Sequence, residues 1–125
     1  MGFEEMFGVV GPPPDPNPTL VVNLRRDPYD VYIGRAGHGL EGYFGNPIRR
    51  DEPCPECGTV HRTKGATLDC FELYARRRIN EDPEYRVRVR ALWGRRLGCF
   101  CKPTSRCHGD VLREITHELH EEESA

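Results

Sequence analysis

The chain has 125 residues, of which 37% are hydrophobic and 30% charged, enough for one domain with a single modest core. Its formal net charge of -2 at pH 7 argues against a protein with a strongly basic surface that binds nucleic acid. A membrane helix needs about 20 consecutive apolar residues, and a secretory signal begins with basic residues before an apolar run. We find neither pattern in the sequence and therefore expect a cytoplasmic protein. In that compartment its cysteines would be reduced or would bind metal.

Residues 1–18 are expected to form a flexible arm outside the fold. Five prolines occur between residues 11 and 18, and proline suits neither a helix interior nor a central strand. The single folded domain is therefore predicted to span residues 19–125.

Two short apolar runs, at residues 20–24 and 31–33, predict buried strands. Residues 34–47 follow with five glycines and little periodicity. Long glycine-rich loops inside small domains are often binding loops, so we expect this segment to contribute to a site.

Helices are predicted at residues 68–79 and 84–93, where apolar residues recur at helical spacing. Asp82 is the expected N-cap of the second helix, with Pro83 at its first position. Residues 97–101 then form an apolar run that indicates a third strand.

A turn at residues 102–106 leads into the last predicted helix. Its apolar residues at helical spacing are Val111, Leu112, Ile115 and Leu119. Strands interleaved with helices predict an α/β fold, namely a small three-layer Rossmann-like sheet that is at least partly parallel. A zinc-knuckle insertion is expected at about residues 49–70.

The insertion contains Cys54 and Cys57 in a Cys-x-x-Cys turn, with His61 four residues later and Cys70 at the next helix start. Thiolates with imidazole suit tetrahedral Zn²⁺, so a structural zinc ion is predicted on these four residues. Other candidates for the fourth ligand are Cys99, Cys101, Cys107 and His108. A redox Cys-x-x-Cys pair is the alternative, although such pairs normally open a helix after a strand.

The segment LGCFCKPTSRCHGD, residues 97–110, is the strongest candidate for chemistry. Helix N-termini attract anions and lower thiol pKa values, so Cys107, His108 and Asp110 are candidate nucleophile and acid–base groups. The structural alternatives are a packed thiol and a carboxylate that only complements the helix dipole, and for Cys99 we expect simple burial.

In parallel sheets, ligands bind beyond the carboxyl ends of the strands, where the glycine-rich loop and the Cys107 turn would meet. Arg35 suits a phosphate or carboxylate, and the asparagine amides suit a nucleobase edge or ribose. The predicted substrate-binding residues are Asn23, Tyr32, Gly34, Arg35, Gly45, Asn46 and Cys101.

The chain resembles the family of domain of unknown function 4326, small proteins of actinobacteria and their phages. The motifs that carry the resemblance are VVN at 21–23, VYIGR at 31–35, FGNP at 44–47, CPECGTVH at 54–61 and GCFCKPTSRCHGDVL at 98–112. The last block also resembles the ending of domain of unknown function 488, in which an arginine stands at the position of Gly109. Neither resemblance implies an established reaction.

These features predict an enzyme that binds a nucleotide, nucleobase or nucleotide-sugar and transfers or hydrolyses a group, with Cys107 or Asp110 as nucleophile and His108 as acid–base. One alternative is a non-catalytic protein that sequesters or senses a nucleotide. Another is a zinc-knuckle protein that binds nucleic acid through the eight arginines between Arg76 and Arg96. The sequence leaves the oligomeric state open.

Overall fold

The computed structural model describes residues 17–37, 39–63, 65–100 and 106–124. Its elements in chain order are β1 (Leu20–Asn23), β2 (Val31–Tyr32), α1 (Leu68–Glu81), α2 (Pro83–Arg90), β3 (Arg96–Cys99) and α3 (His108–Ser124). The expectations for the arm at residues 1–16, for Cys101 and for most of the turn before α3 fall outside the described residues.

The three strands form one parallel sheet in the order β1-β3-β2. Val21 pairs with Leu97 on one side of β3, and Tyr32 pairs with Gly98 on the other. The prediction of an α/β domain with parallel strands is confirmed. Parallel pairing also brings the carboxyl ends of all three strands to one edge of the sheet.

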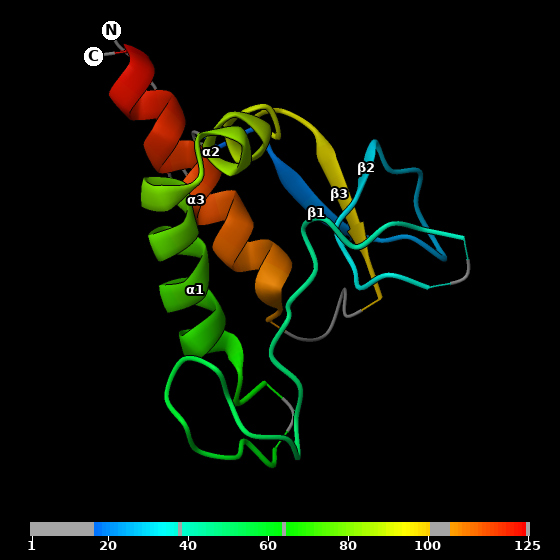
Figure 1. Ribbon diagram of the computed structural model, residues 1–125. Helices are drawn as coiled ribbons and strands as arrows, with labels where there is room; N and C mark the ends of the chain where they lie inside the picture. Colours follow the sequence, from blue (N-terminus) through cyan, green and yellow to red (C-terminus); the bar gives the residue numbers. More distant parts are fainter. Residues whose placement is uncertain (1–16, 38, 64, 101–105, 125) are drawn as a thin grey trace, which may run out of the picture.

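Helix α3 packs on one face of the sheet. A Cβ built on Gly109 of α3 would lie 2.8 Å from Val21 Cγ1 and 2.7 Å from Ile33 Cδ1. In Figure 1, α1, α2 and α3 lie together on the same side of the strands. The described residues therefore form two layers, and the three-layer Rossmann-like arrangement stays a prediction.

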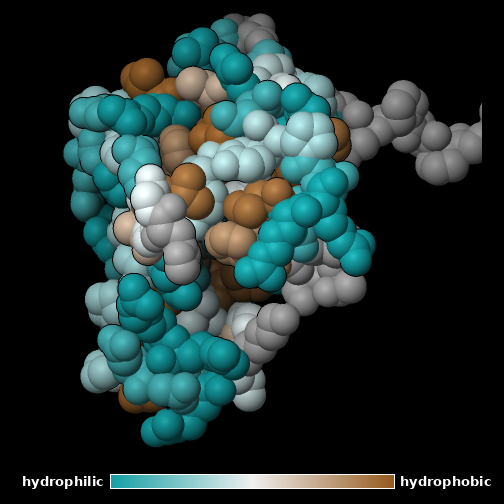
Figure 2. All heavy atoms as spheres, turned by 90° about the vertical axis from the view of Figure 1, so that its right-hand side faces the viewer, coloured by the Kyte–Doolittle hydropathy of each residue, from teal (hydrophilic) through white to brown (hydrophobic). Residues whose placement is uncertain are grey.

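The opposite sheet face carries large apolar side chains that no described helix covers. Tyr29 packs over Gly98, where an added Cβ would lie 2.7 Å from the tyrosine ring. Leu20 is 51% exposed and Phe100 is 45% exposed. Figure 2 shows apolar groups near the middle of the side on which the sheet lies, surrounded by polar ones.

Local sequence explains where the helices begin. The Asp82 carboxylate accepts hydrogen bonds from the amides of Glu84 and Tyr85, so Asp82 caps α2 with Pro83 at the first helical position, as predicted. Helix α1 buries Cys70, Phe71, Ala75 and Ile79. None of the helices in the described part of the chain is long and apolar enough to span a bilayer.

Asn17 lies at the start of the described chain and already belongs to the fold, two residues before the expected domain boundary. Its side chain is buried and donates a hydrogen bond to the Arg113 carbonyl of α3 at 3.0 Å. Arg113 in turn donates to the carbonyls of Asn17 and Thr19. These bonds fix the entry of the chain into β1 because they anchor it to α3.

Candidate functional site

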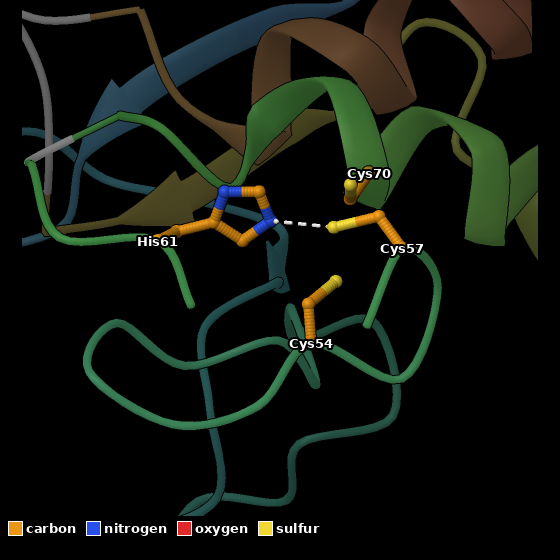
Figure 3. A group of neighbouring side chains, drawn as sticks. All are labelled: Cys54, Cys57, His61 and Cys70. Carbon is orange, nitrogen blue, oxygen red and sulfur yellow. Dashed lines mark hydrogen bonds between the residues drawn. The ribbon is translucent and has the colours of Figure 1, made fainter. Parts of the chain in front are cut away.

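Cys54, Cys57, His61 and Cys70 come together at the base of α1. Their potential ligand atoms all lie within 4.8 Å of one another, and the side chains point toward a common centre (Figure 3). Cys57 Sγ lies 3.5 Å from His61 Nε2. The structure therefore assembles the Cys₃His set that the sequence predicts, with Cys70 as its fourth member.

Backbone hydrogen bonds shape the segment that carries three of these residues. The Cys54 amide donates to the Thr59 carbonyl at 2.8 Å, and the Gly58 amide donates to the Cys54 carbonyl at 2.9 Å. Gly58 has φ +78, a conformation that glycine adopts without strain. This tight turn places Cys54 and Cys57 on one side, facing Cys70 in the first turn of α1.

The thiols of the cluster differ in their acidity. Hydrogen bonding with Thr59 lowers the pKa of the Cys57 thiol to about 6, because the bond stabilises the thiolate. Burial raises the pKa of the Cys70 thiol to about 12. A bound cation would compensate the buried negative charge and allow Cys70 to ionise near neutral pH.

The spacing of the four ligand atoms fits a tetrahedral ion. Zinc bonds of about 2.3 Å to sulfur and about 2.0 Å to nitrogen require ligand atoms about 3.5–3.8 Å apart. The observed separation of 3.5 Å between Cys57 and His61 agrees with this, and the 4.8 Å limit leaves only a small contraction. The cluster can hold a metal ion.

A cleft opens at the carboxyl edge of the sheet and encloses about 630 Å³, within the range of about 300–1,000 Å³ that is typical of small-molecule sites. It lies where β2 and β3 end and where α1 and α3 begin. Its lining residues are Tyr32, Gly34, Arg35, Ala36, Gly37, Asn46, Arg50, Gly65, Thr67, Leu68, Cys99, Phe100, Arg106, Cys107 and His108.

Six of the predicted site residues therefore share the cleft: Tyr32, Gly34, Arg35, Asn46, Cys107 and His108. Two of them are engaged in holding the glycine-rich loop. Arg35 donates to the carbonyls of Asn46 and Ile48 at 2.9 and 2.7 Å. The Asn46 amide donates to Thr67 Oγ1 and accepts from the Ile48 amide. These bonds give the Arg35 and Asn46 side chains a structural role, because they shape the wall of the cleft.

Three other predicted residues lie outside the lining of this cleft. The Asp110 carboxylate accepts a hydrogen bond from the Cys107 amide at 2.8 Å and so caps α3. Asn23 accepts from the Arg25 amide in the turn after β1. A Cβ on Gly45 would lie 2.8 Å from the Gly34 carbonyl oxygen, so Gly45 serves close backbone packing.

His108 begins α3 and is held at the inner wall of the cleft. Its Nε2–H donates to the Ile33 carbonyl, which leaves Nδ1 as the ring nitrogen that can accept a proton. Burial lowers the pKa of His108, so the neutral imidazole predominates near pH 7. A neutral, oriented imidazole is suited to act as a general base.

Cys107, the residue before α3, is buried at the same wall. Its Sγ lies 3.5 Å from Sγ of Cys99, which ends β3. The position at the N-terminus of a 17-residue helix favours the thiolate over the thiol. The expectation that Cys99 is buried is confirmed, and its sulfur lies beside that of Cys107.

Cleft residues absent from the sequence-based set include Arg50, Thr67, Phe100 and Arg106. Arg106 directly precedes Cys107, and Phe100 directly follows Cys99, so adjacency to the cysteines is the signal that could have selected them. Arg50 and Thr67 reach the cleft through the path of the loop between β2 and α1, which spacing alone does not reveal.

Comparisons with known proteins agree on one relationship. The family described as Domain of unknown function (DUF4326) matches residues 22–118. A similar protein is the "Uncharacterized 12.4 kDa protein in nrdA-td intergenic region" of Enterobacteria phage T4. It is 31% identical over 99 residues, which cover 79% of this chain and 78% of the phage protein. No solved structure matches the chain significantly.

Proposed function

The chain belongs to the family described as Domain of unknown function (DUF4326), and from its own residues we propose an enzyme whose carboxyl-edge cleft binds a nucleotide-like anion. The observation that carries this proposal is that Arg50 and Arg106 line the same cleft as the first residues of α1 and α3. Guanidinium groups and helix N-termini both favour phosphate.

The rest of the lining supports an aromatic ligand attached to the phosphate. Tyr32 and Phe100 form an edge-on pair with ring centroids 6.4 Å apart at one wall. Aromatic faces stack on nucleobases, while backbone groups of the glycine-rich loop can read ribose or base edges. A nucleotide, nucleobase or nucleotide-sugar is the ligand class that we propose.

Cys107 and His108 supply the proposed chemistry. The Cys107 thiolate would attack the transferred group and expel the leaving group, and His108 would move the proton through Nδ1. Water or another acceptor would then release the group from sulfur, so the overall reaction is a transfer or hydrolysis. The proposed step assigns no role to Asp110, whose carboxylate caps α3.

We propose that the Cys₃His cluster holds a structural Zn²⁺ in a zinc-knuckle insertion. Three thiolates and one imidazole are a common ligand set for structural zinc, and no position is left for a substrate. The ion would bind the loop between β2 and α1 to the first turn of α1. Such a site persists in a reducing compartment, which agrees with the cytoplasmic location that we propose.

Nucleic-acid binding has weaker support. Seven of the eight arginines between Arg76 and Arg96 form ion pairs with carboxylates, and this reduces the positive charge available to a phosphate backbone. These arginines are Arg76, Arg77, Arg78, Arg86, Arg88, Arg90 and Arg96.

A non-catalytic nucleotide-binding protein is the other alternative, and it would use the same cleft without a reaction at Cys107.

Binding can be tested by calorimetric titration of the metal-loaded protein with inorganic phosphate, nucleosides and nucleoside 5′-mono- and diphosphates. Arg50→Ala should weaken binding of the phosphorylated ligands about tenfold or more. Arg62→Ala is the matched control, because Arg62 is an exposed arginine of the same insertion that pairs with Asp51. Equal effects of both variants, or no binding by any phosphorylated ligand, would reject the cleft as an anion site.

Catalysis is tested separately on a ligand that binds. Cys107→Ser and His108→Gln should each abolish turnover while the circular dichroism spectrum and ligand affinity persist. Full turnover by Cys107→Ser would exclude the thiolate mechanism. Tight binding of an unchanged ligand by the native protein would favour the sequestering or sensing alternative.

A further inference from the structure

The two thiols Cys99 and Cys107 form a second sulfur centre, separate from the Cys₃His cluster. Cys99 lies at the end of β3 and Cys107 immediately precedes α3, and their sulfur atoms are 3.5 Å apart. Their exposed fractions are 1% and 3%. Both residues nevertheless line the open cleft, so a small molecule in the cleft can reach the pair.

The two positions give the thiols different roles. Cys107 stands where the helix dipole of α3 stabilises a thiolate, which is the nucleophilic form of cysteine. Cys99 has no helix start of its own but already contacts the Cys107 sulfur. An oxidised Cys107 would therefore have a resolving thiol in place, and only a local shift would bring the sulfurs to the bonding distance of about 2.05 Å.

We propose that Cys99 and Cys107 form a reversible dithiol–disulfide site whose oxidant is hydrogen peroxide. The Cys107 thiolate attacks the peroxide oxygen, the O–O bond breaks, and a sulfenic acid and hydroxide form. The Cys99 sulfur then attacks the Cys107 sulfur, and the sulfenic oxygen leaves as water. In sum, two thiols are oxidised to a disulfide and one peroxide is reduced to two waters.

The disulfide would have two consequences in the cleft. It would tie the end of β3 to the start of α3, and it would remove the Cys107 thiolate from any reaction in the cleft. A thiol reductant would restore both sulfurs by exchange. The redox site stands on the sulfur geometry, the position of Cys107 before α3 and the open cleft, so it does not require the nucleotide function proposed above.

The site can be tested on the reduced, metal-loaded native protein. One equivalent of hydrogen peroxide is added, remaining thiols are blocked with an alkylating agent, and the protein is digested with trypsin without reduction. Cleavage after Arg96, Arg106 and Arg113 yields the peptides 97–106 and 107–113. We expect these two peptides to be joined by a disulfide, with the peptides of the Cys₃His cluster still alkylated.

The peptide 97–106 also contains Cys101, so two variants identify the partner. The crosslink should persist in Cys101→Ser and disappear in Cys99→Ser. In Cys99→Ser, the Cys107 sulfenic acid should accumulate and be trapped by dimedone, about tenfold above its level in the native protein. The native digest keeps the test valid even if a variant folds poorly.

A crosslink that survives Cys99→Ser, oxidation confined to the Cys₃His cysteines, or no thiol loss would each overturn the proposal. Restoration of both thiols by dithiothreitol is the expected final step. Oxidation that dithiothreitol does not reverse would show overoxidation of Cys107 and would also reject a reversible site.

Discussion

Phe71 and His108 pack edge to face, with ring centroids 5.4 Å apart and planes at 85°. Phe71 follows the cluster residue Cys70 on α1, whereas His108 begins α3 at the wall of the cleft. This aromatic contact therefore links the helical turn that carries Cys70 to the wall of the cleft. A change in the first turn of α1 should therefore alter the surroundings of the His108 ring.

Metal removal provides the first prediction. Chelation should lower the melting temperature by roughly 5–10 °C, because the loop between β2 and α1 loses its attachment to Cys70. It should also broaden or shift the NMR signal of the His108 ring. Differential scanning calorimetry and histidine NMR measure the two effects, and added Zn²⁺ should reverse both.

A control separates the loss of metal from a direct effect of the chelator. Cys57→Ser should mimic chelation, and this variant should not respond further to the chelator. An unchanged melting temperature after verified metal loss would refute a structural metal ion. A lower melting temperature with an unchanged His108 signal would refute the coupling through Phe71.

Arg35 gives a second prediction, since its guanidinium donates to the carbonyls of Asn46 and Ile48 at once. Lysine retains the charge but cannot span both carbonyls with the same planar geometry. Arg35→Lys should reduce the free energy of unfolding by about 1–2 kcal/mol, as measured by urea denaturation. The matched control is Arg49→Lys, at an exposed arginine of the same segment, and an equal effect of both variants would contradict the clamp.

His108 gives a third prediction, which concerns pH. Burial lowers the pKa of His108 in the folded state below its ordinary value near 6.5. At pH values between the folded-state and unfolded-state pKa, the unfolded chain therefore binds more protons than the folded protein. The contribution of His108 to stability should be present above about pH 6.5 and should be lost as pH falls toward the folded pKa.

The effect is isolated by comparing the native protein with His108→Gln, which can still donate to the Ile33 carbonyl. The difference in unfolding free energy between the two should shrink as the pH is lowered from 7 to 5. The comparison cancels the effects of acid on the Cys₃His cluster because both proteins retain its four residues. A difference in unfolding free energy that does not change with pH would show that His108 has the same pKa in the folded and unfolded states.

Local sequence signals predict the helices and strands and the assembly of the Cys₃His cluster. Helix α2 was recognisable because Asp82 and Pro83 are adjacent capping residues, and the Cys₃His set because Cys-x-x-Cys is a local turn. The cleft was harder to predict from sequence, because its residues arrive from segments far apart. Asn46, for example, is oriented by Thr67, 21 residues later.

Side-chain roles depended on geometry that residue type does not encode. Asp110 has the right chemistry for a nucleophile, yet its carboxylate turns back to the Cys107 amide. Arg35 has the right chemistry for phosphate, yet carbonyl groups of its own loop satisfy two of its donors. Arg50 and Arg106 line the same cleft, so part of its positive charge comes from residues that the sequence did not single out.

Gly109 gives the fourth prediction and concerns the contact between α3 and the sheet. In a helix, alanine is more favourable than glycine by about 1 kcal/mol, so propensity alone predicts that Gly109→Ala is stabilising. The added Cβ would lie 2.7 Å from Ile33 Cδ1 and 2.8 Å from Val21 Cγ1, closer than Cβ contacts normally permit. Overpacking typically costs about 1–3 kcal/mol, so we expect net destabilisation in urea denaturation.

Glu121→Ala, on the exposed side of α3, is the control and should leave stability nearly unchanged. The close approach also leaves no room for a long side chain at this position, because its Cβ would have to lie between Val21 and Ile33. If Gly109→Ala proved more stable than the native protein, α3 would have to sit farther from β1. The wall of the cleft that His108 forms would then move outward with it.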